Sequence, residues 1–177
     1  MATQYSREAD VALALKMADA ADVISMARYQ SQDLVITTKP DNTPVTDADK
    51  ATEKALRDIL AKERPDDGLV GEEFGTSGTD AKRYWVIDPI DGTTNFIHGF
   101  PQYCVSIALQ QRGQITQAVV YDPTRNELFT ASKGEGAYLN DKRIRVTKRD
   151  KMTDALIGTG FPFRDMKGLD EYMQMFR

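Results

Sequence analysis

The chain of 177 residues is long enough for one domain, or for one domain and part of a second. Hydrophobic residues make up 41% of it and charged residues 28%, so it can bury a core as ordinary globular proteins do. The net charge of −4 and the lack of a long basic run argue against a nucleic-acid groove.

The single cysteine, Cys104, excludes an internal disulfide framework and fits a reducing compartment. Its apolar neighbours predict a buried strand position for Cys104 rather than a role as nucleophile. The N-terminal residues contain no apolar signal-peptide core, and no stretch is long enough to cross a membrane. We therefore expect a cytoplasmic protein with no membrane partner.

The first third of the chain is predicted to hold two helices separated by a strand. Apolar residues from Leu13 to Ala27 recur at helical spacing, which predicts an amphipathic helix. Thr46 is a good N-cap, and Asp49 three residues later completes a capping-box-like start to the second helix. Between the helices, 39–44 contains two prolines and turn-forming residues that break regular structure. The predicted ranges are 6–29 and 47–63 for the helices and 34–38 for the strand.

The central segment Trp85-Val-Ile-Asp-Pro-Ile-Asp-Gly-Thr-Thr-Asn-Phe96 carries the most chemistry. Its first residues are aromatic and β-branched, which predicts a short buried strand that stops at Asp88. Asp88 and Asp91 then stand three residues apart, and Gly92 opens a short helix whose first amides are free. Two carboxylates beside a helix start can hold a divalent cation next to an anion, so the segment predicts a phosphate site with its metal.

The remaining strands and turns predict an α+β protein. A strand begins at 69–70, and 75–82 is small and polar, which indicates a surface loop. Short turns separate the strands after the central segment, as in an antiparallel meander. An apolar stripe from Leu169 begins a helix that is cut off at the end of the sequence, which indicates a fragment of a longer chain. The predicted strands after the central segment are 104–111, 115–121, 127–131, 137–139 and 155–159.

Three acidic pairs stand where regular elements meet loops, a common place for functional groups. Hard cations such as Mg²⁺ prefer oxygen ligands, and few carboxylates suffice to bind them. The alternative is that these carboxylates are solvated or cap helices, and capping alone explains the first pair. The third pair is drawn inward by apolar neighbours, where unpaired carboxylates are costly. The pairs are Asp47/Asp49, Glu72/Glu73 and Asp88/Asp91.

His98 is the only histidine, which excludes a multi-histidine metal site and a catalytic histidine pair. We expect it to pack in the turn formed by 96–100. Lys39, just before Pro40, is either a surface charge or a cation that reaches the acidic residues, and the sequence leaves both alternatives open.

The motif Asp88-Pro-Ile-Asp-Gly-Thr-Thr-Asn-Phe96, preceded by Gly71-Glu-Glu73 and Pro44-Val-Thr-Asp-Ala-Asp49, resembles the inositol monophosphatase family. Family members are Mg²⁺-dependent, lithium-sensitive phosphomonoesterases with a layered α/β/α/β/α fold. The resemblance covers nearly the whole chain, and the three motifs occur in the family's order. It implies that fold here, truncated after the first domain.

The resemblance also implies the metal ligands. Glu72, Asp88 and the carbonyl of Ile90 correspond to ligands of a first metal ion. Asp88 bridges to a second ion, which Asp91 also binds. The implied cofactor is Mg²⁺, with two or three ions in each site.

The implied catalytic and substrate-binding residues lie beside the metal ligands. Glu72 positions the attacking water, and the hydroxyl of Thr93, paired with Asp49, is the second water-activating group. The amides of Gly92 and Thr93 hold the phosphate, and Asp91 contacts the substrate. Supporting residues implied by the resemblance are Glu73 and Lys39.

The chain departs from the family pattern at its C-terminal end. The family's later Trp-Asp motif, whose aspartate completes the second metal site, is absent before Arg177. The sequence therefore resembles a metal- and phosphate-binding domain over 1–150, followed at 151–177 by the opening of a second α/β domain.

The substrate class follows from the resemblance, but two subgroups are represented. Residues 38–49 and 64–75 resemble histidinol-phosphate phosphatases, whereas 93–99, 121–127 and 158–163 resemble bacterial inositol monophosphatases. We expect Mg²⁺-dependent hydrolysis of a small polyol phosphate, with inositol 1-phosphate as the first candidate and histidinol phosphate as the alternative.

A binding role is the alternative from another class, because some bacterial relatives engage the transcription machinery and RNA. Lys142-Arg-Ile-Arg145 with Lys148 and Arg149 forms a modest basic cluster. Ile144 and Val146 interleave this cluster at strand spacing, which favours a solvated face. Family members are usually homodimers, and we expect one here.

Overall fold

The computed structural model describes residues 5–161 and 166–176. It divides the chain into two compact units, Met1–Arg145 and Val146–Arg177. Each unit is described by itself. Of the helices described, none combines the length and the apolar character that crossing a bilayer requires.

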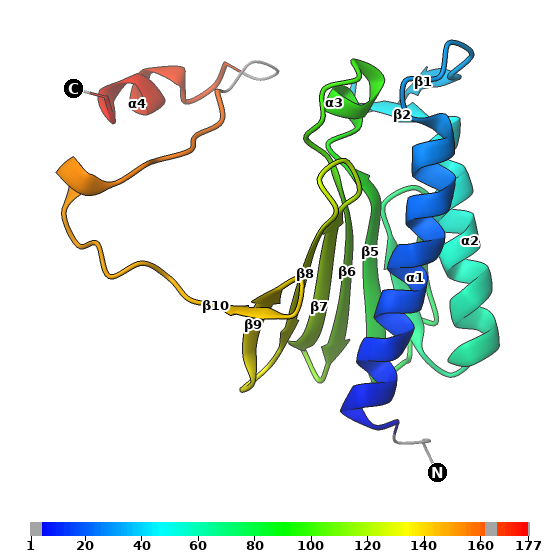
Figure 1. Ribbon diagram of the computed structural model, residues 1–177. Helices are drawn as coiled ribbons and strands as arrows, with labels where there is room; N and C mark the ends of the chain where they lie inside the picture. The colour runs from blue at the N-terminus through cyan, green and yellow to red at the C-terminus, as the bar shows by residue number, and fades with distance from the viewer. Residues whose placement is uncertain (1–4, 162–165, 177) are drawn as a thin grey trace. The chain divides into compact units, whose positions relative to one another are not determined.

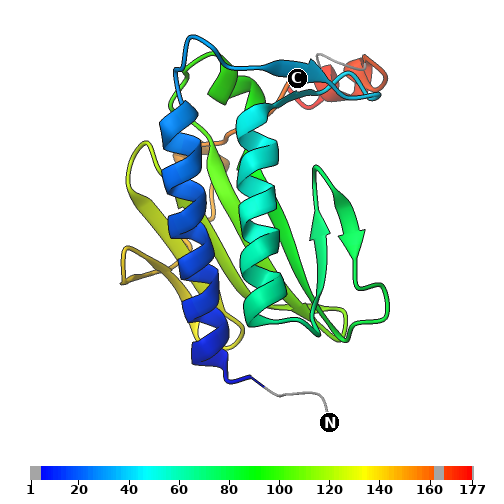
Figure 2. The same cartoon turned by 90° about the vertical axis from the view of Figure 1, so that its right-hand side faces the viewer.

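The first unit is a mixed sheet with two long helices packed side by side on one face (Figures 1 and 2). The helices are α1 (Arg7–Arg28) and α2 (Asp47–Glu63). The sheet has eight strands in the order β10-β9-β8-β7-β6-β5-β3-β4. This arrangement confirms the predicted α+β class.

All neighbouring strands of the sheet are antiparallel except β3 and β5, which are parallel. The predicted meander is confirmed from β6 to β9, and β10 extends it by one strand at the edge of the sheet. The strands are β3 (Gly68–Gly71), β4 (Gly75–Ser77), β5 (Arg83–Asp91), β6 (Cys104–Gln111), β7 (Gln114–Asp122), β8 (Glu127–Ser132), β9 (Gly136–Leu139) and β10 (Lys142–Ile144).

Local capping signals fix where the helices begin. Ser6 caps α1 by accepting a hydrogen bond from the Ala9 amide at 3.2 Å. Thr46 and Asp49 form a reciprocal capping box at the start of α2, as the sequence predicts. Apolar faces of both helices then pack on the sheet in one core. The largest fully buried members of this core are Trp85, Met17, Leu56, Ile107 and Leu109.

A small ribbon and a short helix stand near the end of β5 (Figure 1). The ribbon pairs β1 (Ile36–Thr38) with β2 (Pro44–Thr46), and its turn carries Lys39. The short helix is α3 (Thr93–Ile97), which begins where the sequence places it. Its Phe96 packs with Ile90 and Tyr103 in a second buried cluster that supports this end of the sheet.

Three predicted boundaries are wrong. Strand β5 does not stop at Asp88 but continues to Asp91, with a register shift between them that accommodates Pro89. Pro44 begins β2 instead of lying in a break, because the ribbon pairs it with Thr38. Strand β4 lies inside the predicted loop 75–82, where it pairs with β3 as an antiparallel hairpin.

The second unit contains a 3-10 turn, Met152–Asp154, and a helix α4 (Leu169–Gln174). The helix begins at the predicted residue, and its Tyr172 packs edge-on against Phe161 with ring centroids 5.8 Å apart. The predicted strand over 155–159 is wrong. That apolar segment is extended but unpaired in the part of the chain described, and Leu156 and Ile157 face solvent.

Candidate active site

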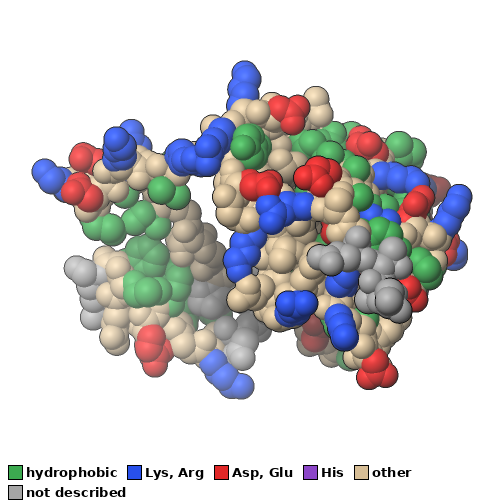
Figure 3. Space-filling model, turned by 90° about the horizontal axis from the view of Figure 1, so that it is seen from below, with side chains coloured by type: hydrophobic (Ala, Val, Ile, Leu, Met, Phe, Trp, Pro, Cys, Tyr) green, Lys and Arg blue, Asp and Glu red, His purple; other side chains and the backbone are tan. Residues whose placement is uncertain are grey.

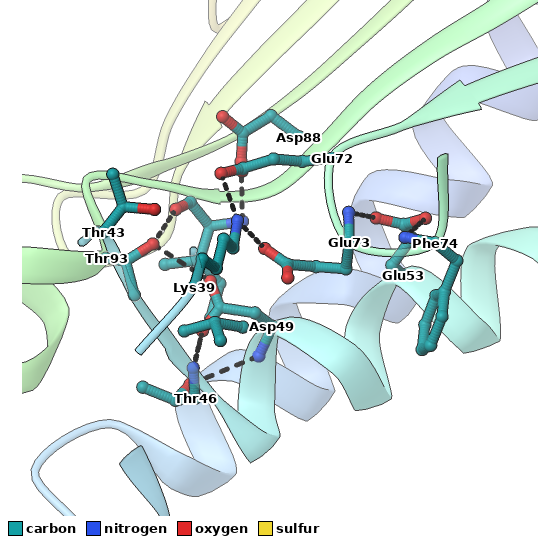
Figure 4. Close-up of polar contacts among 12 residues, drawn as sticks. Lys39, Thr43, Thr46, Asp49, Glu53, Glu72, Glu73, Phe74, Asp88 and Thr93 are labelled. Carbon is teal, nitrogen blue, oxygen red and sulfur yellow. Dashed lines mark hydrogen bonds and ion pairs between the residues drawn. The ribbon is translucent and has the colours of Figure 1, made fainter. Parts of the chain in front are cut away.

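The candidate site lies where β5 ends. Four segments meet there: the ribbon turn with Lys39, the start of α2, the turn between β3 and β4, and the entry to α3 (Figure 4). Most of the side chains singled out by the resemblance point toward one another across these segments. Strand β5 supplies Asp88 and Asp91, the turn after β3 supplies Glu72 and Glu73, and the start of α2 supplies Asp49.

Asp49 is fully buried at the start of α2. Its Oδ2 accepts hydrogen bonds from the amide of Thr46 at 2.8 Å and from the hydroxyl of Thr46 at 2.5 Å. Its Oδ1 lies 3.1 Å from the Thr93 hydroxyl, which is also 3.1 Å from the Ile90 carbonyl. Burial raises the pKa of Asp49, although the Thr46 and Thr93 hydrogen bonds oppose that rise. The capping role and the pairing with Thr93 therefore coexist in one carboxylate.

Lys39 reaches the acidic residues, which decides the alternative that the sequence leaves open. Its Nζ lies 2.7 Å from Glu72 Oε1 and 2.7 Å from Glu73 Oε1. Burial alone would lower the pKa of Lys39, but hydrogen bonds to the two carboxylates and their charges raise it. Burial raises the pKa of Glu73, and Lys39 opposes that rise. A fixed positive charge thus lies among the acidic groups.

Asp88 is the most perturbed carboxyl of the site. Its Oδ1 accepts a hydrogen bond from the Ile90 amide at 3.2 Å. Burial and then the nearby charge of Glu72 raise the pKa of Asp88 to about 8, and Asp91 adds to the effect. The clustered carboxylates therefore repel one another, and a cation would relieve that repulsion.

Gly92 joins β5 to α3 in a conformation that suits glycine. Its φ is +105°, and a Cβ there would lie 3.0 Å from the carbonyl oxygen of Gln102. Beside Gly92 and Asp91 a cavity of about 520 Å³ opens, bounded by residues of β6, β7 and β8. Its size falls within the range of small-molecule sites.

The donor set fits a hard divalent cation. Carboxylates at Glu72, Asp88 and Asp91 and the Ile90 carbonyl are all oxygen ligands, the kind that Mg²⁺ prefers. Among the residues described, no three acidic, histidine or cysteine side chains are gathered closely enough to form a metal cage. Because Mg²⁺ usually keeps several waters, a more open arrangement of donors still suits it.

Several residues that the sequence singled out lie elsewhere or differ from expectation. Asp47 pairs with Arg28 at 2.8 Å and supports the ribbon, outside the site. His98 follows the last residue of α3 and is exposed. The expectation that its side chain packs in the turn is therefore wrong. Cys104 lies on β6 as predicted but is only half-buried. Burial, followed by the charges of Asp91 and Asp88, raises the pKa of the Cys104 thiol to about 12.

The basic segment Lys142–Arg145 is exposed, as expected for a solvated face. Its strand pairs with β9 at the edge of the sheet. On the face shown in Figure 3, Lys and Arg side chains are interspersed with Asp and Glu rather than gathered in one patch.

Glu53 and Arg57 were missed from the sequence. Glu53 is fully buried on α2 beside the Glu72–Phe74 turn, and Arg57 pairs with it at 2.8 Å. A signal was present, because Glu53 follows Asp49 by one helical turn and Arg57 follows by another, on the same face of the predicted helix.

The fold and the site together define the class of protein. It is an α+β protein that gathers carboxylates and a threonine–aspartate pair where a central strand meets a short helix.

Comparison with known proteins agrees with this class. The model of the inositol monophosphatase family matches residues 4–176. The Nus factor SuhB of Pseudomonas aeruginosa is 45% identical over 171 residues, which cover 93% of this chain and 63% of that protein. The inositol-1-monophosphatase of Rhizobium meliloti is 46% identical over 132 residues, covering 74% and 50%.

A solved structure shows the same fold. The crystal structure of the extragenic suppressor protein suhB from Bartonella henselae superposes with a TM-score of 0.87 at 38% identity, covering 93% of this chain and 64% of that one. The chain belongs to the inositol monophosphatase family, a family of phosphatases. It spans between half and two thirds of the length of these relatives.

Proposed function

We propose that this chain carries the metal- and phosphate-binding part of a phosphatase that hydrolyses a small polyol phosphate, with myo-inositol 1-phosphate as the first candidate. The observation that carries the proposal is the hydrogen bond between the buried Asp49 and the partly buried Thr93, beside the carboxylates at the end of β5. Family membership and the relative named inositol-1-monophosphatase support the substrate class.

Asp49 and Thr93 would serve as the base. The Thr93 hydroxyl donates toward Asp49 or the Ile90 carbonyl, and its lone pairs stay available to an attacking water. As the water oxygen bonds to phosphorus, one water proton passes to Thr93 Oγ1 and the Thr93 proton passes to Asp49 Oδ1. The bond between phosphorus and the ester oxygen breaks, and the leaving alkoxide takes up a proton from a solvent water to give the alcohol. Burial raises the pKa of Asp49, which strengthens it as an acceptor.

The other site residues would bind metal and substrate. Glu72, Asp88, Asp91 and the Ile90 carbonyl would hold Mg²⁺, which when bound supplies a water of lowered pKa and offsets the phosphate charge. The amides at Gly92 and Thr93 would face the phosphate, and Asp91 would contact the polyol. The cavity of about 520 Å³ adjoins this group of residues at Asp91 and Gly92, whereas Glu72, Asp88 and Thr93 do not line it.

The test is phosphate release from inositol 1-phosphate and from histidinol phosphate, with and without Mg²⁺. It should compare this chain with a version extended over the length that its relatives cover, each beside an Asp91→Asn variant. We expect Mg²⁺-dependent release by the extended protein and loss of at least about 100-fold in Asp91→Asn. No release from any polyol ester by either form would overturn the proposal, and the preferred ester would identify the subgroup.

The relatives named Nus factor SuhB favour a second candidate function, a binding role in transcription. Salt-dependent binding of RNA or of transcription proteins by a catalytically silent protein would support that role. We further propose a cytoplasmic homodimer, which sedimentation of the extended protein would test.

A further inference from the structure

Glu53 is a charged side chain with no exposed surface, directly behind the acidic turn of the candidate site. Its carboxylate accepts two backbone hydrogen bonds from that turn. The Glu73 amide donates to Oε2 at 2.6 Å, and the Phe74 amide donates to Oε1 at 3.1 Å (Figure 4). A buried carboxylate needs such donors, because an unpaired charge is costly away from water.

Arg57, one helical turn further along α2, ties the same carboxylate to the strand after the turn. Its Nε donates to Glu53 Oε1 at 2.8 Å, its Nη2 donates to the Gly75 carbonyl, and its Nη1 lies 3.4 Å from Ser77 Oγ. The guanidinium also stacks 5.8 Å from the centroid of the Phe74 ring. Helix α2 is thus hydrogen-bonded both to the turn that carries Glu72 and to the strand that follows it.

Gly71 shows how closely this contact is fitted. A Cβ at this position would lie 2.0 Å from Glu53 Oε1 and 2.9 Å from the Arg57 guanidinium. The backbone conformation of Gly71 suits any residue, so the need for glycine comes from the approach of Glu53. The Glu53–Arg57 pair therefore occupies the space that a side chain at position 71 would need, and glycine is the residue that fits there.

We propose that Glu53, held by Arg57, is a positioning residue that fixes the Glu72–Phe74 turn and so places the Glu72 carboxylate for the cation. This inference rests on the proposed function of Glu72. Glu72 would bind the cation directly, and the buried pair of Glu53 and Arg57 would orient Glu72. Outer groups of this kind commonly affect metal affinity by 10- to 100-fold when they are removed.

The test compares Glu53→Gln with Asp58→Asn. Asp58 lies on the same helix and forms an i,i+4 ion pair with Lys54, in which Nζ and Oδ2 are 2.7 Å apart. This pair is exposed and does not contact the turn. Both variants thus remove one negative charge and one pair from α2. Amide hydrogen exchange at Glu73 and Phe74 reports the turn, and calorimetric titration with Mg²⁺ alone reports the cation site, in this chain and in the extended protein.

We expect Glu53→Gln to lower exchange protection of both amides at least tenfold and to weaken Mg²⁺ binding about tenfold, with Asp58→Asn unchanged. Arg57→Lys, which keeps the charge but not the fork-shaped reach, should give a smaller loss in the same direction. The Arg57→Lys variant keeps the test decisive if Glu53→Gln fails to fold. Unchanged protection, or lost protection with unchanged Mg²⁺ affinity, would overturn the inference. If the unaltered proteins bind no Mg²⁺, the proposed function fails, whereas lost protection would still show that Glu53 holds the turn.

Discussion

Replacing Asp88 by Asn should make the metal-free protein less sensitive to rising pH. The pKa of Asp88 is raised to about 8 in the fold, from an ordinary value of 3.8, chiefly by burial and by Glu72. Between those two values the folded state binds a proton that the unfolded state releases. The contribution of protonated Asp88 to the stability of the fold is therefore present at low pH and is lost as the pH rises toward 8.

The magnitude follows from that pH window. Each pH unit within it costs up to about 1.4 kcal/mol, so pH 5 to 8 spans roughly 4 kcal/mol for a fully buried group. Because water reaches part of the Asp88 side chain and screens it, we expect about half of this, ~2 kcal/mol. For a chain of this size, that corresponds to roughly 4–8 °C in the melting temperature.

The assay is urea unfolding of the wild type and Asp88→Asn in a chelating buffer at several pH values from 5 to 8. The free energy of unfolding of the wild type should fall by ~2 kcal/mol more than that of the variant. Adding Mg²⁺ should restore stability to the wild type alone, since the variant lacks the Asp88 carboxylate that would help to hold the ion. Parallel pH curves for the two proteins would refute the reasoning about the carboxylate cluster.

Three further predictions concern single residues. Thr93→Val should lower phosphate release by the extended protein at least about 100-fold while Thr93→Ser keeps most of it, and near-normal release by the valine variant would remove Thr93 from the chemistry. Gly92→Ala should cost about 1–3 kcal/mol in urea unfolding, more than Gly113→Ala, because both positions have positive φ but only Gly92 is crowded; equal losses would mean that crowding contributes nothing. With its pKa at about 12, Cys104 should react with iodoacetamide at pH 8 roughly 100-fold more slowly than in urea-unfolded protein, and equal rates would contradict its shielding.

Local signals predicted the elements that depend on neighbouring residues. The capping box of Thr46 and Asp49 identified the start of α2, and the short turns between strands led to the observed bounds of β6, Cys104–Gln111. The entry to α3 at Gly92 was also correct, because a glycine before two threonines favours a helix start after a strand. These elements contribute Leu56, Phe96 and Leu109 to the buried core.

Elements that depend on distant partners were not predicted. Strand β5 extends to Asp91 because β6 pairs with it, and that partner is remote in the sequence. The segment 155–159 has strand composition but is unpaired in the described part of the chain, and composition alone does not make a strand. The contacts of Lys39 with Glu72 and of Glu53 with the acidic turn also depend on residues distant in the sequence. The sequence alone therefore did not predict them.

The topology of the sheet also orders the steps by which the chain folds. The meander from β6 to β9 is joined by short turns, so its hairpins close at low entropic cost and form early. The parallel pairing of β3 with β5, and the approach of Lys39 to Glu72, close longer loops and come later. A chromophore attached near Lys39 would therefore report a later kinetic phase than a probe placed in the hairpin of β6 and β7.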